Sequence, residues 1–300
     1  MGLLRHYAPR NGNELKMNSP KKLLIIIIIL TALGMAACLF LYQEKEKLLE
    51  VVFMDVGQGD AILIKTPYDQ QILIDGGPDN QVLQKLGQHM PFWDRSIDLL
   101  ILTHPHSDHV GGLPAVMDRY QVEQIFYTGV LHTSPDYLAW LQKIEEQAVD
   151  LKITKSGDRV NLGNDLYLDT LFPLEDYTNQ EVEDLNGTSV VNKLVYGQHA
   201  FLLTGDLPAE QELAVLNQGI NVTADVLKVG HHGSKYSSSS EFLSDVDPQY
   251  AIVQVGQDNK FGHPHLVALN NIESSGAVIL RSDKLGDIKC QSDKSVLSCF

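Results

Sequence analysis

The chain has 300 residues, and its 38 acidic and 23 basic side chains give a net charge of −15. This balance argues against nonspecific binding of polyanions, because lysine and arginine contacts to phosphate dominate that kind of affinity. The roughly 250 residues after position 50 can bury one substantial core, so they need form only one domain.

The first 50 residues differ in composition from the rest. Residues 1–22 carry five basic side chains and one acidic one, and residues 23–42 carry no charge. About 20 apolar residues span a hydrocarbon core of about 30 Å as a helix, and the basic flank predicts a cytoplasmic N-terminus. We therefore expect a cytoplasmic tail (1–22), a transmembrane anchor (23–42), a linker (43–50) and an extracytoplasmic domain (51–300). Through residues 23–42 the chain would be attached to the membrane.

A cleaved signal is the alternative to this anchor. Residues 35–38, Met-Ala-Ala-Cys, resemble a lipoprotein processing site, and cleavage before Cys38 would leave a secreted domain. The sequence stays apolar after Cys38, which favours the uncleaved anchor. Without residues 1–42, the remainder carries a net charge of −19.

The expected domain begins with short apolar runs bounded by glycine and proline. They predict strands over 51–55, 61–65 and 71–75, and a helix over 80–90. Asp60 and Asp75 fall at ends of these strands, where an acidic residue is more often a turn cap than a functional group.

The central motif is an H-x-H-x-D-H string between a buried strand (97–102) and a helix (113–120). Backbone alternation directs its first two histidines onto one metal ion, and the turn into the helix directs its aspartate and last histidine onto a second. A histidine-rich surface loop is the alternative, but the string arises by chance in about one in a thousand such chains. The candidate ligands are His104, His106, Asp108 and His109.

The remaining elements alternate between strands and helices. The pattern predicts a β-meander over 152–172 and helices over 137–149 and 208–218. It also predicts strands over 122–130, 190–196, 200–204, 224–229, 250–255, 277–281 and 287–290.

Six segments of the chain resemble the hydrolase domain of the ComEC/Rec2 competence proteins, a branch of the metallo-β-lactamase fold. The resemblance implies an α/β fold, a four-layer αββα sandwich, with metal ligands along one edge. The segments are 55–61, 73–77, 103–112, 202–206, 227–234 and 262–265.

The resemblance also implies roles for residues outside the string. Asp206 would bridge two divalent ions, and Asp60 and Asp75 would orient the metal site. Adjacent side chains diverge, so we expect His232 to bind metal and His231 to lie beside it. No matching motif contains His132 or His199, so the first metal site is expected to lack one protein ligand and stay open to water or substrate.

Asp108 and His263 are the expected catalytic residues, and whether His263 binds metal or donates a proton to substrate is left open. Lys228, Lys235 and Lys260 flank the same loops and are candidate phosphate contacts. Histidine and carboxylate ligands suit both Zn²⁺, which we expect, and Mn²⁺.

Two bridged ions lower the pKa of a shared water, which is hydrolysis chemistry. None of the three cysteines lies in a motif, which favours phosphoric esters over β-lactams. We expect an extracytoplasmic phosphodiesterase or nuclease, with single-stranded DNA as a candidate substrate and no protein partner inferable. The alternatives are a surface phosphodiesterase for a smaller ester such as phosphocholine, and a binding module that has lost its metal.

Cys290 and Cys299 lie in the closing segment, on either side of an expected turn at 292–295. An oxidising exterior would allow them to form a disulfide. Two free thiols in a disordered tail are the alternative.

Overall fold

The computed structural model describes the backbone of residues 19–43 and 48–300 and the side chains of 20–36 and 48–300. The chain divides into two compact units, Met1–Glu46 and Lys47–Phe300. Most of the expected cytoplasmic tail (1–18) and most of the expected linker (44–47) lie outside the described residues.

The described residues of the first unit form a helix, α1 (Ser19–Gln43). Its large apolar side chains are exposed, from 44% at Ile25 to 67% at Met35. A membrane crossing takes about 20 apolar residues, whereas the side chains described in α1 end at Ala36. In the described part of the chain, no helix has the length and apolarity that a crossing requires, so the predicted transmembrane anchor over 23–42 is not confirmed.

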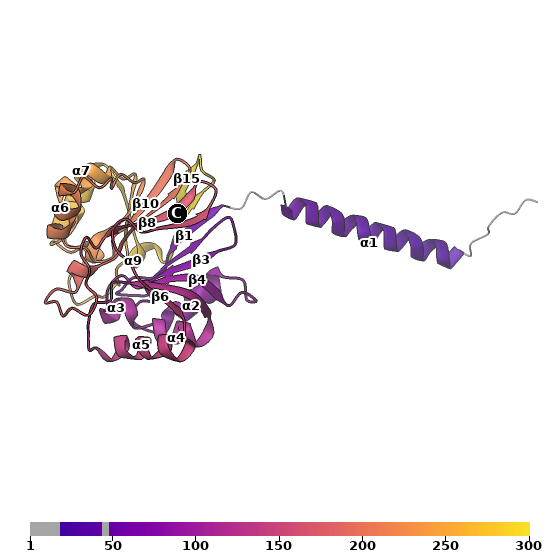
Figure 1. Cartoon of the computed structure of the whole chain (residues 1–300). Helices are drawn as coiled ribbons and strands as arrows, with labels where there is room; N and C mark the ends of the chain where they lie inside the picture. Colours follow the sequence, from indigo (N-terminus) through magenta and orange to yellow (C-terminus); the bar gives the residue numbers. More distant parts are fainter. Residues whose placement is uncertain (1–18, 44–47) are drawn as a thin grey trace, which may run out of the picture. The chain divides into compact units, whose positions relative to one another are not determined.

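The second unit is built on two sheets, which Figure 1 shows packed face to face. The first sheet has the order β15-β14-β1-β2-β3-β4-β5-β6, antiparallel from β15 to β3 and parallel from β3 to β6. Its strands are β1 (Leu49–Phe53), β2 (Ile62–Lys65), β3 (Gln71–Ile74), β4 (Ser96–Ile101), β5 (Gln121–Tyr127), β6 (Asp150–Ile153), β14 (Ile288–Ser292) and β15 (Leu297–Cys299).

The second sheet has the order β13-β12-β11-β10-β9-β8-β7, parallel from β10 to β13 and antiparallel elsewhere. Its strands are β7 (Arg159–Gly163), β8 (Leu166–Phe172), β9 (Val191–Tyr196), β10 (His199–Leu203), β11 (Val226–Lys228), β12 (Tyr250–Val253) and β13 (Val278–Arg281).

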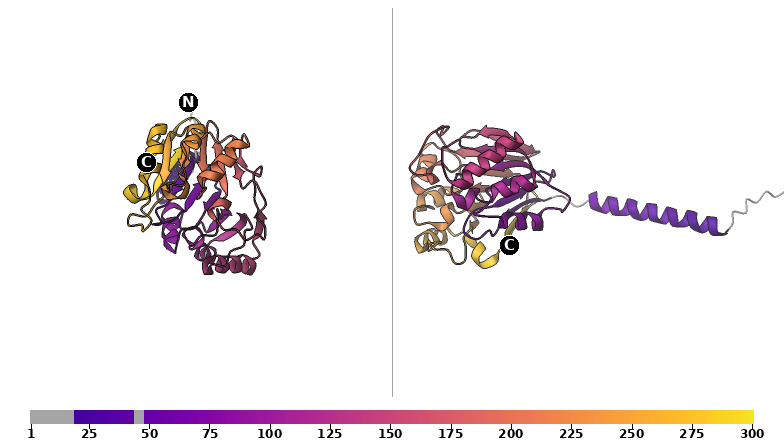
Figure 2. Two further views of the ribbon diagram at one scale, coloured as in Figure 1. Left: turned by 90° about the vertical axis from the view of Figure 1, so that its left-hand side faces the viewer. Right: turned by 90° about the horizontal axis from the view of Figure 1, so that it is seen from below.

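Helices cover the outer face of each sheet, as two views show (Figure 2). The first sheet carries α2 (Gln81–His89), α3 (Ser107–Val110), α4 (Leu113–Arg119) and α5 (Pro135–Gln147). The second half of the unit contains α6 (Ala209–Asn217), α7 (Ser240–Val246), α8 (Leu266–Ser275) and α9 (Ser282–Leu285), and two 3-10 turns at Asn186–Thr188 and Gly230–Gly233.

Three buried apolar clusters hold these layers together. One lies between the sheets and contains, for example, Phe53 of β1 and Phe201 of β10, both fully buried. A second joins the first sheet to its helices around Trp140, and a third joins the second sheet to α6, α7 and α8 around Phe242. Three cores separate four layers, so the second unit is an αββα sandwich.

The structure corrects one prediction about the elements and adds helices that the sequence analysis did not predict. Residues 152–172 do not form one meander, because β6 pairs with β5 in the first sheet whereas β7 and β8 belong to the second. A turn at 154–158 carries the chain between the sheets, and strand periodicity cannot reveal such a crossing. The helices α7 and α8 were not predicted from the sequence. The N-terminus of α7 is capped by Ser239, whose side chain accepts a hydrogen bond from Phe242 N.

The closing segment folds back as expected. Strands β14 and β15 pair antiparallel with Cys290 opposite Cys299, and these two cysteines form a disulfide. The predicted disulfide is therefore confirmed.

Candidate metal centre

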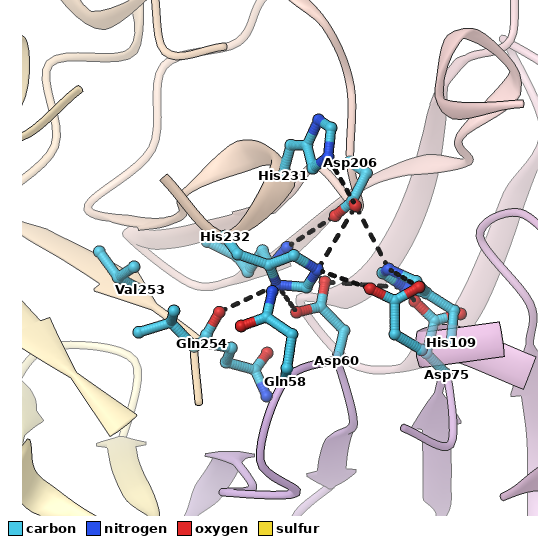
Figure 3. A network of polar contacts seen from close by, with 12 residues as sticks. Gln58, Asp60, Asp75, His109, Asp206, His231, His232, Val253 and Gln254 are labelled. Atoms are coloured by element: carbon cyan, nitrogen blue, oxygen red, sulfur yellow. Dashed lines mark hydrogen bonds and ion pairs between the residues drawn. The ribbon is translucent and has the colours of Figure 1, made fainter. Parts of the chain in front are cut away.

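The candidate centre lies where parallel strands of both sheets end. The H-x-H-x-D-H string follows β4, Asp75 follows β3, Asp206 follows β10, and His232 lies just after β11. Carboxyl ends of neighbouring parallel strands meet at one edge, which is why segments far apart in the sequence converge here. Figure 3 shows Asp206 and His232 approaching His109 from the opposite sheet.

Four side chains form the centre of this cluster: Asp108, His109, Asp206 and His232. One potential ligand atom from each lies within 4.8 Å of the other three. Asp206 Oδ2 lies 3.4 Å from His109 Nε2 and 3.5 Å from His232 Nε2, and Asp108 Oδ2 lies 3.3 Å from His232 Nε2. Both Nε2 atoms are buried without a hydrogen-bond partner, as expected of atoms arranged to face a cation.

Two further carboxylates fix the orientation of these imidazoles. His109 Nδ1 donates to Asp75 Oδ2 at 2.7 Å, and Thr103 donates to Asp75 through both its N–H and its hydroxyl. His232 Nδ1 donates to the Gln254 carbonyl at 3.0 Å and lies 3.3 Å from Asp60 Oδ1. Each histidine thus turns its Nε2 toward the cluster, a usual arrangement behind metal ligands.

The backbone separates the two adjacent histidines. His231 and His232 both adopt left-handed conformations, with φ of 48° and 52°. Such geometry costs about 1–3 kcal/mol at each non-glycine residue and persists where the surroundings enforce it. His232 is 1% exposed within the cluster, whereas the His231 side chain is 27% exposed and its Nε2 lies 3.9 Å from Asp206 Oδ2. The structure therefore places His232, rather than His231, among the converging ligands.

His104 and His106 form a pair next to this group, and the His104 ring lies 4.1 Å from the His109 ring. His104 Nε2 lies 2.9 Å from His106 Nδ1, and His104 Nδ1 contacts the hydroxyls of Thr103 (3.1 Å) and Ser189 (3.4 Å). His199 lies at the start of β10, the opposite end from Asp206, and its Nδ1 lies 3.6 Å from Asp225. No further histidine or acid joins this pair in a group of three among the described residues.

A buried lysine lies beneath the centre. Lys228 is fully buried, donates to the Gly205 carbonyl at 2.8 Å, forms an ion pair with Asp60 and lies 3.6 Å from Asp206 Oδ1. Burial opposes its charge, but Asp60 and Asp206 raise its pKa. The prediction that Lys228 contacts phosphate is wrong, because this ammonium is enclosed by protein.

The histidine pKa values divide the centre in two. Burial opposes protonation of His232, but Asp206 and Asp60 outweigh it and raise the pKa to about 10. His109 likewise has a raised pKa, because Asp206 and Asp75 overcome its burial. Burial instead lowers the pKa of both His104 and His106.

The carboxylates of the centre call for positive charge. Burial raises the pKa of Asp75, whereas His232 and His109 overcome burial and hold the pKa of Asp206 well below its ordinary value. Asp60 and Asp108 also have lowered pKa values. Lys228 lies beside Asp60 and Asp206, and His109 lies within 3.9 Å of all four carboxylates. Buried charges need such partners. Divalent ions held by imidazole and carboxylate fit this set of donors.

A cleft of about 280 Å³ opens beside the cluster. His263 lines it, with its ring 5.5 Å from His231 and 6.3 Å from His232, so it lies beside the group of four rather than within it. The Lys260 ammonium lies over the ring of Phe261, which lines the cleft, and the Lys235 ammonium lies over the Tyr236 ring. Neither lysine is itself among the residues that line the cleft.

Some residues of the centre escaped sequence reasoning. Gln254 holds His232 through its carbonyl and bridges to the Met54 and Ala61 carbonyls through its amide. Thr103 holds Asp75. Gln254 and Thr103 both follow the end of a strand, and this position was the one sign in the sequence that they could belong to the centre. Gly59 needs to be glycine, because a Cβ there would lie 2.2 Å from the Asp108 carbonyl oxygen.

The four-layer fold and the candidate binuclear centre define a metallo-β-lactamase-fold, metal-dependent hydrolase. The family model of the metallo-beta-lactamase superfamily matches residues 54–257. The chain therefore belongs to this superfamily, which confirms the resemblance noted in the sequence.

Curated relatives support the competence branch. The chain is 32% identical to ComE operon protein 3 of Bacillus subtilis over 84% of its own length and 34% of that protein. It is 30% identical to competence protein ComA of Neisseria gonorrhoeae over 80% of the chain and 32% of that protein. The chain thus spans about a third of these relatives. Among solved structures, the metallo-beta-lactamase fold protein YhfI of Bacillus subtilis is similar, with a TM-score of 0.53 and 12% identity over 84% of this chain and all of that one.

Proposed function

We propose that the chain is a two-metal phosphodiesterase that cleaves single-stranded DNA outside the cytoplasm. The observation that carries the proposal is the position of Asp206 relative to both sets of histidines. Its Oδ2 faces His109 and His232, and its charge also acts on the pKa values of His104 and His106. One carboxylate shared between two sets of ligands is what a bridged pair of ions requires.

The ligands divide between two ion positions. His104, His106 and Asp206 would hold the first ion, and Asp108, His109, His232 and Asp206 would hold the second. Zn²⁺ is proposed for both because imidazoles predominate, and Mn²⁺ is the other candidate. When bound, such ions supply Lewis acidity and a water of lowered pKa.

The chain's own residues perform the remaining tasks. Asp75 and Asp60 keep the imidazoles in position, and Lys228 offsets carboxylate charge from below. His263 lines the cleft, its ring lies 6.3 Å from the His232 ring, and it is outside the group of four potential ligands, so we assign it to the substrate rather than to metal.

A smaller phosphodiester is the second candidate substrate. The observation that favours it is the net charge of −15, because an acidic surface opposes long polyanions. A binding module without metal is disfavoured, since the converging ligands are all present.

The confirmed disulfide supports the proposed location. Disulfides persist outside the reducing cytoplasm, and Cys290 pairs with Cys299 between two strands. Thiol titration of the unfolded, non-reduced full chain isolated from its host should detect one free thiol, that of Cys38. Three free thiols would contradict the location.

The activity is tested with the full chain, loaded with Zn²⁺ or Mn²⁺, on single-stranded DNA, duplex DNA and bis-p-nitrophenyl phosphate. We expect cleavage of single-stranded DNA and of the small ester, lost in Asp206→Ala and kept in the matched control Asp169→Ala, a carboxylate paired with Arg159 away from the centre. Hydrolysis of the small ester alone would favour the second candidate. Loss of all three activities in the metal-loaded wild type would refute the proposal.

A further inference from the structure

One wall of the cleft is the loop between β12 and α8, and Asn259 fixes its shape. The Asn259 amide donates to the carbonyls of Gly256 (2.9 Å) and His263 (2.7 Å). Its carbonyl oxygen accepts from the N–H groups of Phe261 (3.2 Å) and His263 (2.9 Å). Four hydrogen bonds from one side chain hold Phe261 and His263 in a defined arrangement.

Phe261 stands out in this wall. It is the only apolar side chain among the described residues that line the cleft, and it is 51% exposed. Its ring stacks on His263, with centroids 5.7 Å apart and planes inclined by 23°. Scattered exposed apolar residues need no explanation, but a fixed ring in a polar cleft beside a candidate metal centre is placed to contact the substrate.

The neighbouring charge indicates the kind of group this ring would meet. The Lys260 ammonium lies 5.4 Å from the centroid of the Phe261 ring. A quaternary ammonium such as choline would compete with this cation for the ring. A phosphodiester that carries a planar base suits both Phe261 and Lys260, since the base can stack on the ring while the ammonium contacts phosphate.

We propose that Phe261 is a specificity-determining residue that stacks on the base next to the scissile phosphodiester, with Lys260 as its phosphate partner. This inference rests on the proposed phosphodiesterase function. Stacking on an aromatic ring does not depend on net charge, so it supplies affinity that an acidic protein gains poorly from phosphate contacts.

The test compares two substrates of the metal-loaded full chain: thymidylyl-thymidine, and an analogue in which both bases are absent. Phe261→Ala should lower kcat/KM for the first by about tenfold or more, as expected for one lost base stack, and should change the second by less than about twofold. Phe261→Leu keeps apolar bulk without a planar ring, so it should behave like Phe261→Ala. Phe261→Trp keeps a planar ring, so it should retain the higher kcat/KM for thymidylyl-thymidine over the analogue without bases. Phe92→Ala is the matched control, an aromatic residue that is 79% exposed and precedes β4.

A binding measurement without catalysis accompanies these rates. A dinucleotide with 2-aminopurine should lose fluorescence when it binds metal-free wild type or Phe261→Trp, and the quenching should be lost in Phe261→Ala. Equal losses on both substrates, an unchanged rate on thymidylyl-thymidine, or retained quenching in Phe261→Ala would overturn the stacking role alone. Absence of hydrolysis of both substrates by the wild type would overturn the proposed function, and the stacking role with it.

Discussion

The two sides of the candidate centre differ in how many residues support them. On one side, Asp108, His109 and His232 converge on Asp206, and Asp60, Asp75 and the Gln254 carbonyl hold the two rings in place. On the other side, His104 and His106 contact each other and the hydroxyls of Thr103 and Ser189, and the His104 ring lies 4.1 Å from the His109 ring. In the described part of the chain, this pair belongs to no group of three closely spaced potential ligands, and Asp206 is its proposed third ligand. The first side therefore has more supporting residues than the second.

This difference suggests a division of labour within one site. A fully ligated ion is structurally secure, whereas an ion with fewer protein ligands keeps open positions for water and substrate. The pKa values agree, because the carboxylates raise those of His109 and His232, whereas burial lowers those of His104 and His106.

The largest effect is expected from Asp206→Ala, because we propose that both ions share this residue. We expect hydrolysis of bis-p-nitrophenyl phosphate to fall by at least about a thousandfold, the order seen when electrostatic stabilisation of a transition state is lost. Metal analysis should show a weakened hold on both ions. Wild-type turnover and full metal content in this variant would disprove the two-metal arrangement.

His263→Ala should lower the rate while sparing the metal. Loss of a substrate-facing proton donor or hydrogen-bond partner typically costs about 10²–10⁴-fold in rate, and His263 lies beside the ligand group rather than in it. The two quantities are measured on the same preparation, kcat by hydrolysis and metal content by elemental analysis. A whole ion lost per chain would instead make His263 a ligand.

Single-ligand variants should separate the two sides. His232→Ala should weaken the ion on the well-supported side, and His104→Ala should weaken the other, each with little change in its neighbour. Calorimetric titration of the metal-free full chain with Zn²⁺ resolves the two binding steps. Identical isotherms for the two variants would show that the sides are not distinct.

Asp75→Asn should weaken only one side, and by less. Partners behind a ligand typically contribute about 10–100-fold in metal affinity, and Asp75 holds His109 alone among the candidate ligands. Asp98→Asn is a matched control. Asp98 is in β4 and accepts a hydrogen bond from the N–H of Gln71 in β3. The same titration distinguishes them, and an equal change at both ion positions would contradict the assignment.

Asp287→Asn is expected to affect the centre least, because it acts on the stability of the fold. Asp287 accepts from Asp55 N and forms ion pairs with Lys85 and His89, which overcome burial and lower its pKa. A lowered pKa in the folded state stabilises the fold above the ordinary pKa of about 4 and loses that stabilisation as the pH falls. Urea unfolding should therefore show a loss of about 1.5–3 kcal/mol at pH 7 that shrinks below about pH 4. A loss independent of pH would exclude the charge as its cause.

The sequence predicted local features best. The H-x-H-x-D-H string lies at the end of β4 as expected, because a strand, a turn and a helix start were all visible in one short stretch. Neither His132 nor His199 lay in a matching motif, so the expectation that the first metal site lacks one protein ligand stays a prediction. The disulfide followed from two cysteines on either side of a turn.

Features that depend on packing were beyond the sequence. Lys228 looked like a loop lysine available to phosphate, but the fold buries it between Asp60 and Asp206. The strand β6 has strand periodicity, which does not say which of two sheets it joins. Phe261 carried no motif, and only the loop that Asn259 shapes brings it to the cleft.

The unequal support of the two sides is tested most directly by titrating the metal-free full chain with Zn²⁺ and following stoichiometry and affinity together. We predict two ions per chain bound in two steps whose affinities differ by at least about tenfold, the smallest effect attributed to groups that orient ligands. His232→Ala should remove the tighter step and leave the weaker one. A single ion per chain, or two ions of equal affinity that both still bind in His232→Ala, would contradict the unequal support of the two sides.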